Sequence, residues 1–250
     1  MSKREIAVVV GATGDMGKHI VRGLVQAGLK VIAVARSEGA VSALVNESEF
    51  IVPCICDIAS DESIAAISST IDNDVRMVVH GPGVATAGGV MVAPTDSISD
   101  AVNIKVAGLM RLVRSVDPYL VKESRIVAIG GHYGFEPTAY AATAGVANAA
   151  LANLIRQYSW AYGSRGITAH LVAPGPADTE RLMRVASARA EREGISQDQV
   201  MANMKSESAI NSFTKLEEVA WAVKMLLAPE ANSMAGSTLF LDAGRRRGLP

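Results

Sequence analysis

Two side chains near the middle of the sequence, His132 and Tyr140, could carry acid–base chemistry. Tyr140 stands at the start of an alanine-rich segment, "AYAATAGVANAALANLIRQ", that is typical of a helix. A free phenol has a pKa near ~10, so at neutral pH it is a fair acid and a poor base. A histidine has a pKa near ~6.5 and can donate a proton or polarise a carbonyl. Tyr140 and His132 are therefore two candidate acid–base groups; the alternative for His132 is a solvated loop residue.

A glycine-rich turn follows directly after the first apolar run. It reads "GATGDMGKHI" and spaces Gly11, Gly14 and Gly17 as G-x-x-G-x-x-G, with Thr13 inside the turn. Glycines permit a tight turn and let a diphosphate approach the backbone, while the N-terminus of the following helix favours negative charge. The turn therefore predicts a dinucleotide-binding loop. Asp15 would repel the diphosphate unless its carboxylate points outward.

The end of the second apolar run, "VIAVARSEG", predicts which dinucleotide binds. A sheet that binds NAD(H) usually carries an Asp or Glu near this point, where the carboxylate bonds the ribose hydroxyls. Here the chain has Ala35, Arg36 and Ser37. A guanidinium in place of a carboxylate can hold the 2′-phosphate of NADP(H). We therefore expect NADP(H) to be favoured over NAD(H), with Arg36 and Ser37 as contacts; otherwise Arg36 is an ordinary surface residue.

Apolar runs alternate with longer amphipathic stretches along almost the whole chain, which predicts the elements that position these residues. The predicted strands cover residues 5–12, 30–36, 50–57, 76–81, 125–131, 167–175 and 237–244. The predicted helices cover residues 18–28, 40–48, 61–72, 99–121, 139–164 and 215–229. Nearly continuous apolar strands separated by helices indicate an α/β fold: a Rossmann-type, doubly wound, seven-stranded parallel sheet with helices on both faces. Such a sheet binds ligands at the carboxyl ends of its strands.

We read the 250 residues as a single domain, 1–250, because no repeat, low-complexity tract or linker interrupts the pattern. The polar segment 180–212 follows the end of a predicted strand. It is either a mobile lid over the ligand site or a plain helical insertion. Tyr133 and Phe135, with Met183, Met201 and Met204 of that segment, suggest a small and partly apolar ligand.

The composition excludes several classes of partner. A formal net charge of -1 gives no basic field for nucleic acid and no polybasic face for anionic lipid. No apolar run approaches the ~20 residues that cross a membrane, and no signal-peptide core is found, so we expect a cytoplasmic protein. Cys54 and Cys56 stand alone as a CxC pair without further ligands, which predicts packing cysteines and no metal site.

The motifs and their order resemble the short-chain dehydrogenase/reductase (SDR) family over nearly all of the chain. "CDIAS", with Asp57 and Ile58, resembles the family's adenine-contacting Asp and its neighbour, and "HGPG" at 80–83, with Gly81 and Gly83, lies where the family has Asn-Asn-Ala-Gly. The resemblance places Asn103, in "AVNIKVAG", at the helix asparagine that supports a proton-relay water. "APGPADT" at 173–179 resembles the segment that holds the nicotinamide carboxamide. Its contributing residues would be Pro174, Gly175, Ala177 and Thr179.

The sequence departs from the family pattern at two catalytic positions. Gly131 stands where the family has a serine that bonds the substrate carbonyl, and Ala144 stands where it has a lysine four residues after the tyrosine. A cation near the phenol would favour the phenolate, and losing such a donor at a reacting oxygen typically costs on the order of 10²–10³ in rate. Lys105, two positions beyond Asn103, should point to a different helix face, so the sequence predicts no replacement from it.

Three functions remain open from the sequence. The first is an NAD(P)(H)-dependent oxidoreductase that reduces a carbonyl of a small substrate, with Tyr140 as donor, Asn103 organising water and His132 replacing the serine's hydrogen bond. The second is a lyase, isomerase or hydrolase on the same scaffold that uses His132 and Tyr140. The third is a protein that senses dinucleotide without catalysis. The resemblance also implies a homodimer or homotetramer, since the family commonly pairs the helices that hold Asn103 and Tyr140.

Overall fold

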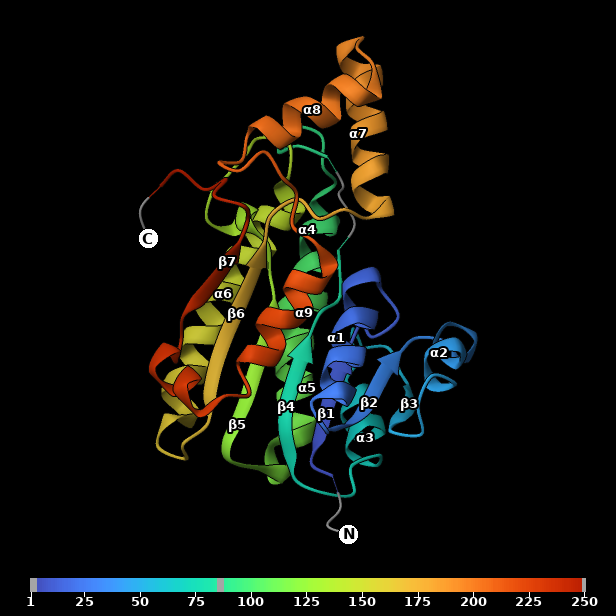
Figure 1. Cartoon of the computed structure of the whole chain (residues 1–250), viewed down its shortest axis with the longest axis vertical. Helices are drawn as coiled ribbons and strands as arrows, with labels where there is room; N and C mark the ends of the chain where they lie inside the picture. The colour runs from blue at the N-terminus through green and yellow to red at the C-terminus, as the bar shows by residue number, and fades with distance from the viewer. Residues whose placement is uncertain (1–3, 85–87, 249–250) are drawn as a thin grey trace.

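A single parallel sheet forms the centre of the protein, with helices on both of its faces (Figure 1). The computed structural model describes residues 4–84 and 88–248. The sheet has seven strands in the order β3-β2-β1-β4-β5-β6-β7, and every pair of neighbours is parallel. The strands are β1 (Ile6–Val10), β2 (Lys30–Ala35), β3 (Ile51–Ile55), β4 (Val75–His80), β5 (Leu120–Ile129), β6 (Thr168–Pro174) and β7 (Thr238–Leu241). The order reverses between β1 and β4, which is the switch point where ligands bind in such sheets. The predicted fold class is confirmed.

The two faces of the sheet bury separate cores. Along β1, Ile6, Val8 and Val10 pack on one side, and Ala7 and Val9 pack on the other, as the alternation of a strand requires. The first core is covered by α3 (Glu62–Ser68), α5 (Gly108–Val116) and α6 (Ala142–Gly163), and the second by α1 (Asp15–Gln26), α2 (Glu38–Val45) and α9 (Leu216–Met225). Because helices cover both faces of the sheet, a ligand can reach the strands only at their ends.

The predicted helix 99–121 is wrong as a single element. The structure divides it into α4 (Thr95–Val102), a π-helical turn (Asn103–Ala107), α5 and a short 3₁₀ turn (Asp117–Tyr119), and β5 already begins at Leu120. Pro118 lies within the 3₁₀ turn, and proline lacks the N–H that would continue an α-helix. The π turn inserts an extra residue into the helix, a feature often found at functional sites.

The segment 180–212 folds into α7 (Glu180–Glu193) and α8 (Gln197–Ser206), which project beyond the carboxyl ends of the strands (Figure 1). Apolar side chains of α7 and α8 pack together with Phe213 in a small cluster that is separate from the two main cores. Among the described residues, no helix combines the length and the apolar character needed to span a bilayer.

The C-terminal residues fasten this helical pair to the rest of the protein. Arg245 forms an ion pair with Glu207, just after α8, and donates a hydrogen bond of 3.0 Å to the carbonyl oxygen of Met204. Glu207 also lies 3.6 Å from Arg189 of α7. On the other side, the carboxylate of Glu136 accepts hydrogen bonds from the backbone N–H groups of the residues at 247 and 248. The chain end therefore links β7, α8 and the loop after β5.

Candidate active site

A first cavity, of about 270 Å³, lies at the carboxyl ends of β1, β2 and β4. It brings together most of the residues predicted to hold a dinucleotide: Gly11, Thr13, Gly14, Arg36, Asp57, Ile58, Gly81 and Gly83. Two predicted contacts, Gly17 and Ser37, line neither this cavity nor the second one that adjoins it. Ser37 is the residue before α2, and its hydroxyl makes no capping bond there.

The glycine turn is shaped as a cradle for a ligand. Gly11 has a φ of +81°, a conformation that favours glycine, and a Cβ added there would lie 3.0 Å from the carbonyl carbon of Gly81. Gly14 precedes the first turn of α1 without any side-chain cap, so the N-terminal N–H groups of that helix face the turn. Open backbone N–H groups at a helix N-terminus suit a diphosphate. The residues present therefore fit a dinucleotide cofactor.

Gly17 acts through packing, and this gives a testable expectation. A Cβ at Gly17 would lie 2.1 Å from the carbonyl oxygen of Gly11, so Gly17→Ala must displace the turn. We expect the free energy of unfolding to fall by about 1–3 kcal/mol and nucleotide binding to weaken, as judged by urea denaturation and NADPH titration. Gly39→Ala is the matched control, because nothing lies within 4 Å of its added Cβ. Equal behaviour of the two variants would contradict this account of Gly17.

A second cavity, of about 210 Å³, adjoins the first and shares Gly83 with it. It contains the predicted Tyr140 and His132 together with the segment after β6, namely Pro174, Gly175, Ala177 and Thr179. The predicted lid contributes Leu182, Val185 and Met204 to its wall, whereas Met183 is exposed and Met201 packs within the helical pair. The oxygen of Thr179 also accepts a 3.3 Å hydrogen bond from Leu182 N, which caps α7.

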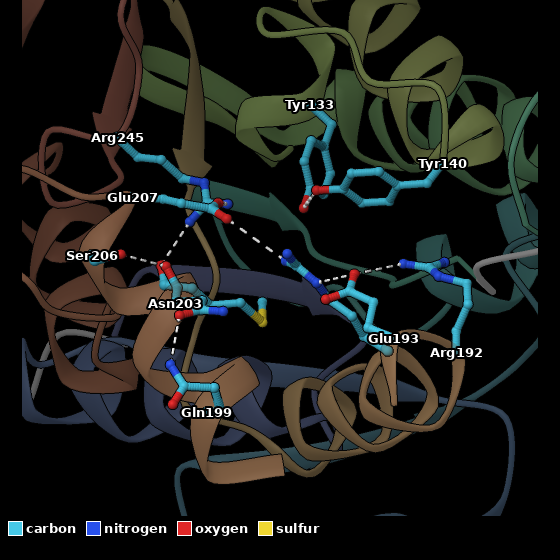
Figure 2. Close-up of polar contacts among 11 residues, drawn as sticks. Tyr133, Tyr140, Arg192, Glu193, Gln199, Asn203, Ser206, Glu207 and Arg245 are labelled. Carbon is cyan, nitrogen blue, oxygen red and sulfur yellow. Dashed lines mark hydrogen bonds and ion pairs between the residues drawn. The ribbon is translucent and has the colours of Figure 1, made fainter. Parts of the chain in front are cut away.

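Tyr140 is paired with a second phenol, Tyr133. Their hydroxyl oxygens are 2.7 Å apart and their rings meet edge to face, with the two hydroxyls pointing toward each other (Figure 2). Tyr140 is 45% exposed and lines the second cavity, and Tyr133 is half-buried beside it. Burial, together with the bond to Tyr140, raises the pKa of Tyr133, so this phenol stays protonated over the whole neutral range. From the sequence, Tyr133 is expected only to contact a partly apolar ligand, so its pairing with Tyr140 is not predicted.

His132 is buried between the phenol pair and β6. Its ring lies 4.0 Å from that of Tyr133, and its Nε2 has no hydrogen-bond partner among the described residues. Burial, reinforced by the charge of Arg245, lowers the pKa of His132 to about 4. The backbone of Pro174 has a smaller, opposing influence on this pKa. His132 lines the second cavity, and its predicted hydrogen bond to a substrate carbonyl stays a prediction.

Asn103 lies apart from the second cavity. Its Nδ2 donates to Ala59 O at 3.1 Å, and its Oδ1 accepts from Arg111 at 2.9 Å. Asn103 is therefore not brought together with Tyr140, and the role in water organisation does not fit its contacts. Lys105 lines the cavity instead. It points to a different helix face from Asn103, as the spacing predicts, but the face that meets the cavity is that of Lys105 and not that of Asn103.

Gly131 and Ala144, the two positions predicted to depart from the family pattern, both line the second cavity. Ala144 lies one turn after Tyr140, and Asn148 lies one further turn along α6. A Cβ at Gly131 would lie 3.0 Å from Nδ2 of Asn148, so the amide fills the space beside the missing side chain. The Oδ1 atom of Asn148 is buried and has no partner among the described residues. The i, i+4, i+8 spacing from Tyr140 could have identified Asn148 from the sequence.

No group of three or more His, Cys, Asp or Glu side chains within the described part of the chain is placed to hold a metal ion. Cys54 is buried and donates to the carbonyl oxygen of Ala66 at 3.6 Å, and Cys56 lines the first cavity. Asp57, in the same wall, accepts a 3.0 Å hydrogen bond from the N–H of Ala59 and remains exposed to the cavity. The side chains that line the second cavity include two phenols, an imidazole, an amide and a lysine amine, from Tyr133, Tyr140, His132, Asn148 and Lys105.

Comparison with known proteins agrees with this geometry. A family model described as enoyl-(acyl carrier protein) reductase matches residues 11–246. The 3-oxoacyl-(acyl-carrier-protein) reductase FabG of Salmonella typhimurium is 27% identical over 249 residues, covering 96% of this chain and 96% of that protein. A variant of actinorhodin polyketide ketoreductase with NADPH has a similar structure, with a TM-score of 0.87 at 22% identity and 97% of each chain covered.

A second solved structure has a comparable likeness. It is an NADPH-bound short chain oxidoreductase from Pseudomonas aeruginosa PAO1 containing an atypical catalytic center, with a TM-score of 0.86 at 20% identity and 98% of each chain covered. At these identities the structures show a common fold. The glycine turn, the parallel sheet and the family match over residues 11–246 together show that the chain belongs to the short-chain dehydrogenase/reductase family of oxidoreductases.

Proposed function

We propose that this protein is an NADP(H)-dependent reductase that converts a carbonyl of a small, partly apolar substrate into an alcohol, with Tyr140 as the proton donor. The observation that carries this proposal is the phenol pair: Tyr133 and Tyr140 are hydrogen-bonded at 2.7 Å inside a cavity that adjoins the glycine-turn cavity. The reductase activities named for the FabG relative and the polyketide ketoreductase support the same direction of reaction.

The two phenols divide the proton chemistry between them. A bound dihydronicotinamide would supply a hydride to the carbonyl carbon. Tyr140 donates its proton to the carbonyl oxygen, which completes the alcohol and leaves a phenolate. Tyr133 stays protonated because burial raises its pKa, so its hydroxyl can donate a hydrogen bond to that phenolate. Tyr140 is then reprotonated from water, to which it is 45% exposed.

The residues around the first cavity would hold the nucleotide. The glycine turn and the start of α1 would bind the diphosphate, and Asp57 and Ile58 would contact the adenine. Pro174, Gly175, Ala177 and Thr179 would bind the carboxamide at the other end. Ala35 and Arg36 line the first cavity, and the exposed guanidinium would pair with a 2′-phosphate.

Arg36→Ala tests the cofactor assignment. We expect purified wild-type protein to bind NADPH at micromolar concentration and more tightly than NADH. Removing a guanidinium–phosphate contact should weaken the binding of NADPH by about 10-fold or more. The affinity for NADH should stay nearly unchanged, and nucleotide fluorescence or calorimetry measures both. Lys224→Ala, an exposed lysine of α9, is a control of equal charge change. If the ratio of NADPH affinity to NADH affinity does not change, Arg36 does not contact the 2′-phosphate. If the protein binds neither nucleotide, the reductase assignment is wrong.

A dinucleotide-binding protein without turnover is a second candidate. Gly131 and Ala144 offer no polar side chain to the cavity that contains Tyr140, and this observation favours it. A screen of aliphatic and aromatic ketones and aldehydes with NADPH separates the two candidates. A non-redox reaction at His132 and Tyr140 would be favoured if the protein bound neither nucleotide.

We also infer a homodimer or homotetramer that pairs α4 and α6 between copies. Val146 and Trp160 are exposed large side chains on α6. Their spacing of 14 residues places them on nearly the same face of that helix, as pairing would require.

A further inference from the structure

Lys105 is a buried lysine in the wall of the catalytic cavity. It lies in the π turn between α4 and α5, and only 5% of its surface is exposed. Its Nζ donates a 2.8 Å hydrogen bond to the carbonyl oxygen of Ile129, the last residue of β5. Gly130, Gly131 and His132 follow directly after that residue and line the same cavity. The lysine is therefore held at the end of the strand from which the catalytic loop departs.

Lys105 is the one side chain in the described lining of the cavity that carries a formal charge. Its described lining contains the side chains of Tyr133, Tyr140, His132 and Asn148, and no carboxylate. His132 is neutral at pH 7, as argued above. His80, which packs beside the π turn through a 2.9 Å contact with Ile104 O, is also neutral, because burial and the charge of Lys105 lower its pKa to about 3. An anionic oxygen in this cavity would therefore meet one charged lining side chain, an ammonium.

We propose that Lys105 is a catalytic residue whose ammonium binds the substrate oxygen on which negative charge develops, in the cavity that Ala144 also lines. The inference rests on the proposed reductase function and assigns a further residue to it. Lys105 transfers no proton: Tyr140 gives the proton to this oxygen, and Lys105 donates a hydrogen bond to it before and during that transfer. An ammonium has three N–H donors, so it can contact Ile129 O and a substrate oxygen together.

Burial explains why this charge should be effective. A charge held away from water interacts more strongly with a developing oxyanion than an exposed one does, because the surrounding dielectric is low. The strand end fixes the ammonium in advance, so little reorganisation accompanies the reaction. Removing one such donor typically costs on the order of 10²–10³ in kcat.

The first experiment measures steady-state reduction by four proteins: wild type, Lys105→Met, Lys105→Arg and the double variant Lys105→Met/Ala144→Lys. We expect Lys105→Met to lower kcat by on the order of 10²-fold while the Kd of NADPH changes little. The arginine variant should retain more activity, and the double variant should regain about 10-fold of the loss by returning an amine to the same cavity. Lys224→Met, an exposed lysine of α9, is the matched charge control.

The second experiment needs no turnover. Butyrate, a short carboxylate, stands in for the oxyanion in a calorimetric or NMR titration of the same variants. We expect wild type, Lys105→Arg and the double variant to bind it, and Lys105→Met to bind it about 10-fold or more weakly, because a hydrogen bond to a charged group is lost. Circular dichroism and the thermal unfolding midpoint establish that each variant is folded.

The two experiments separate the two ideas. If the protein reduces no carbonyl, but Lys105→Met binds butyrate more weakly than wild type does, the reductase assignment is wrong and the assignment of Lys105 as an anion-binding residue is supported. If Lys105→Met reduces substrate at the wild-type rate, or if butyrate binds all variants equally or none, the role of Lys105 is overturned. A loss in Lys105→Met that the double variant does not recover, with butyrate binding unchanged, would mark Lys105 as a structural residue and also overturn the proposal.

Discussion

Replacing Tyr140 by phenylalanine should lower the rate of carbonyl reduction by on the order of 10²–10⁴-fold, because the substitution removes the general acid. The exposed hydroxyl lines the cavity and lies 2.7 Å from that of Tyr133. The change removes one oxygen atom and leaves the ring in place, so the Kd of NADPH should stay within about 2–3-fold, well below 1 kcal/mol. Single-turnover kinetics and nucleotide titration measure the two quantities.

Tyr133→Phe provides the comparison within the same pair. Its hydroxyl supports the phenolate without giving the proton to the substrate, so we expect a smaller loss, of about 10-fold, the size of one supporting hydrogen bond. If Tyr133→Phe abolished the reaction and Tyr140→Phe preserved it, the roles would have to be exchanged. Activity that survives both substitutions would show that neither phenol is the acid.

Lowering the pH from 7 to about 4.5 should reduce the free energy of unfolding by on the order of 5 kcal/mol. Three buried histidines cause the effect. Their pKa values are lowered from 6.5 to about 3 for His80, about 4 for His132 and about 4 for His170. Burial is the main cause for each, followed by the positive charges of Lys105, Arg245 and Arg125 respectively.

The sign follows from proton binding in the two states. Below about pH 6.5 the unfolded chain binds protons at these rings, whereas the folded protein binds few until about pH 4, so stability falls as the pH falls through this window. Each pKa unit corresponds to about 1.4 kcal/mol. Most carboxylates titrate near or below the bottom of the window.

Urea denaturation at pH 7, 6, 5 and 4.5 measures this dependence. His170→Gln should flatten it by about one third, because His170 lies outside the active site and bonds the hydroxyl of Thr168 at 2.8 Å. His19→Gln is the control, since His19 is partly exposed and near Glu217. A free energy of unfolding that stays constant between pH 7 and 5 would show that these rings are not held neutral.

The sequence was sufficient for those parts of the molecule that depend on local pattern. The glycine turn between β1 and α1 could be assigned because spacing and neighbouring elements are both local, and the apolar runs located all seven strands of the sheet. Arg36 and Asp57 could be placed in one cavity because the carboxyl ends of parallel strands meet at one edge.

The parts that could not be predicted depend on geometry that spacing alone does not encode. The spacing of Asn103 and Lys105 places them on different helix faces, but which of the two faces meets the cavity depends on how the helix packs against the sheet. The pairing of Tyr133 with Tyr140 requires the loop after β5 to fold back, and the neutral state of His132 depends on burial and on Arg245, more than one hundred residues away in the chain.

The anchoring of α8 by Arg245 has a consequence for the order of events during synthesis. The ribosome makes Gly83, at the junction of the two cavities, well before Arg245. Domains fold as units while the ribosome delivers the chain from its N-terminus. The wall contributed by Leu182, Val185 and Met204 cannot be anchored until Arg245 has emerged. During synthesis the glycine turn can therefore form before the second cavity closes.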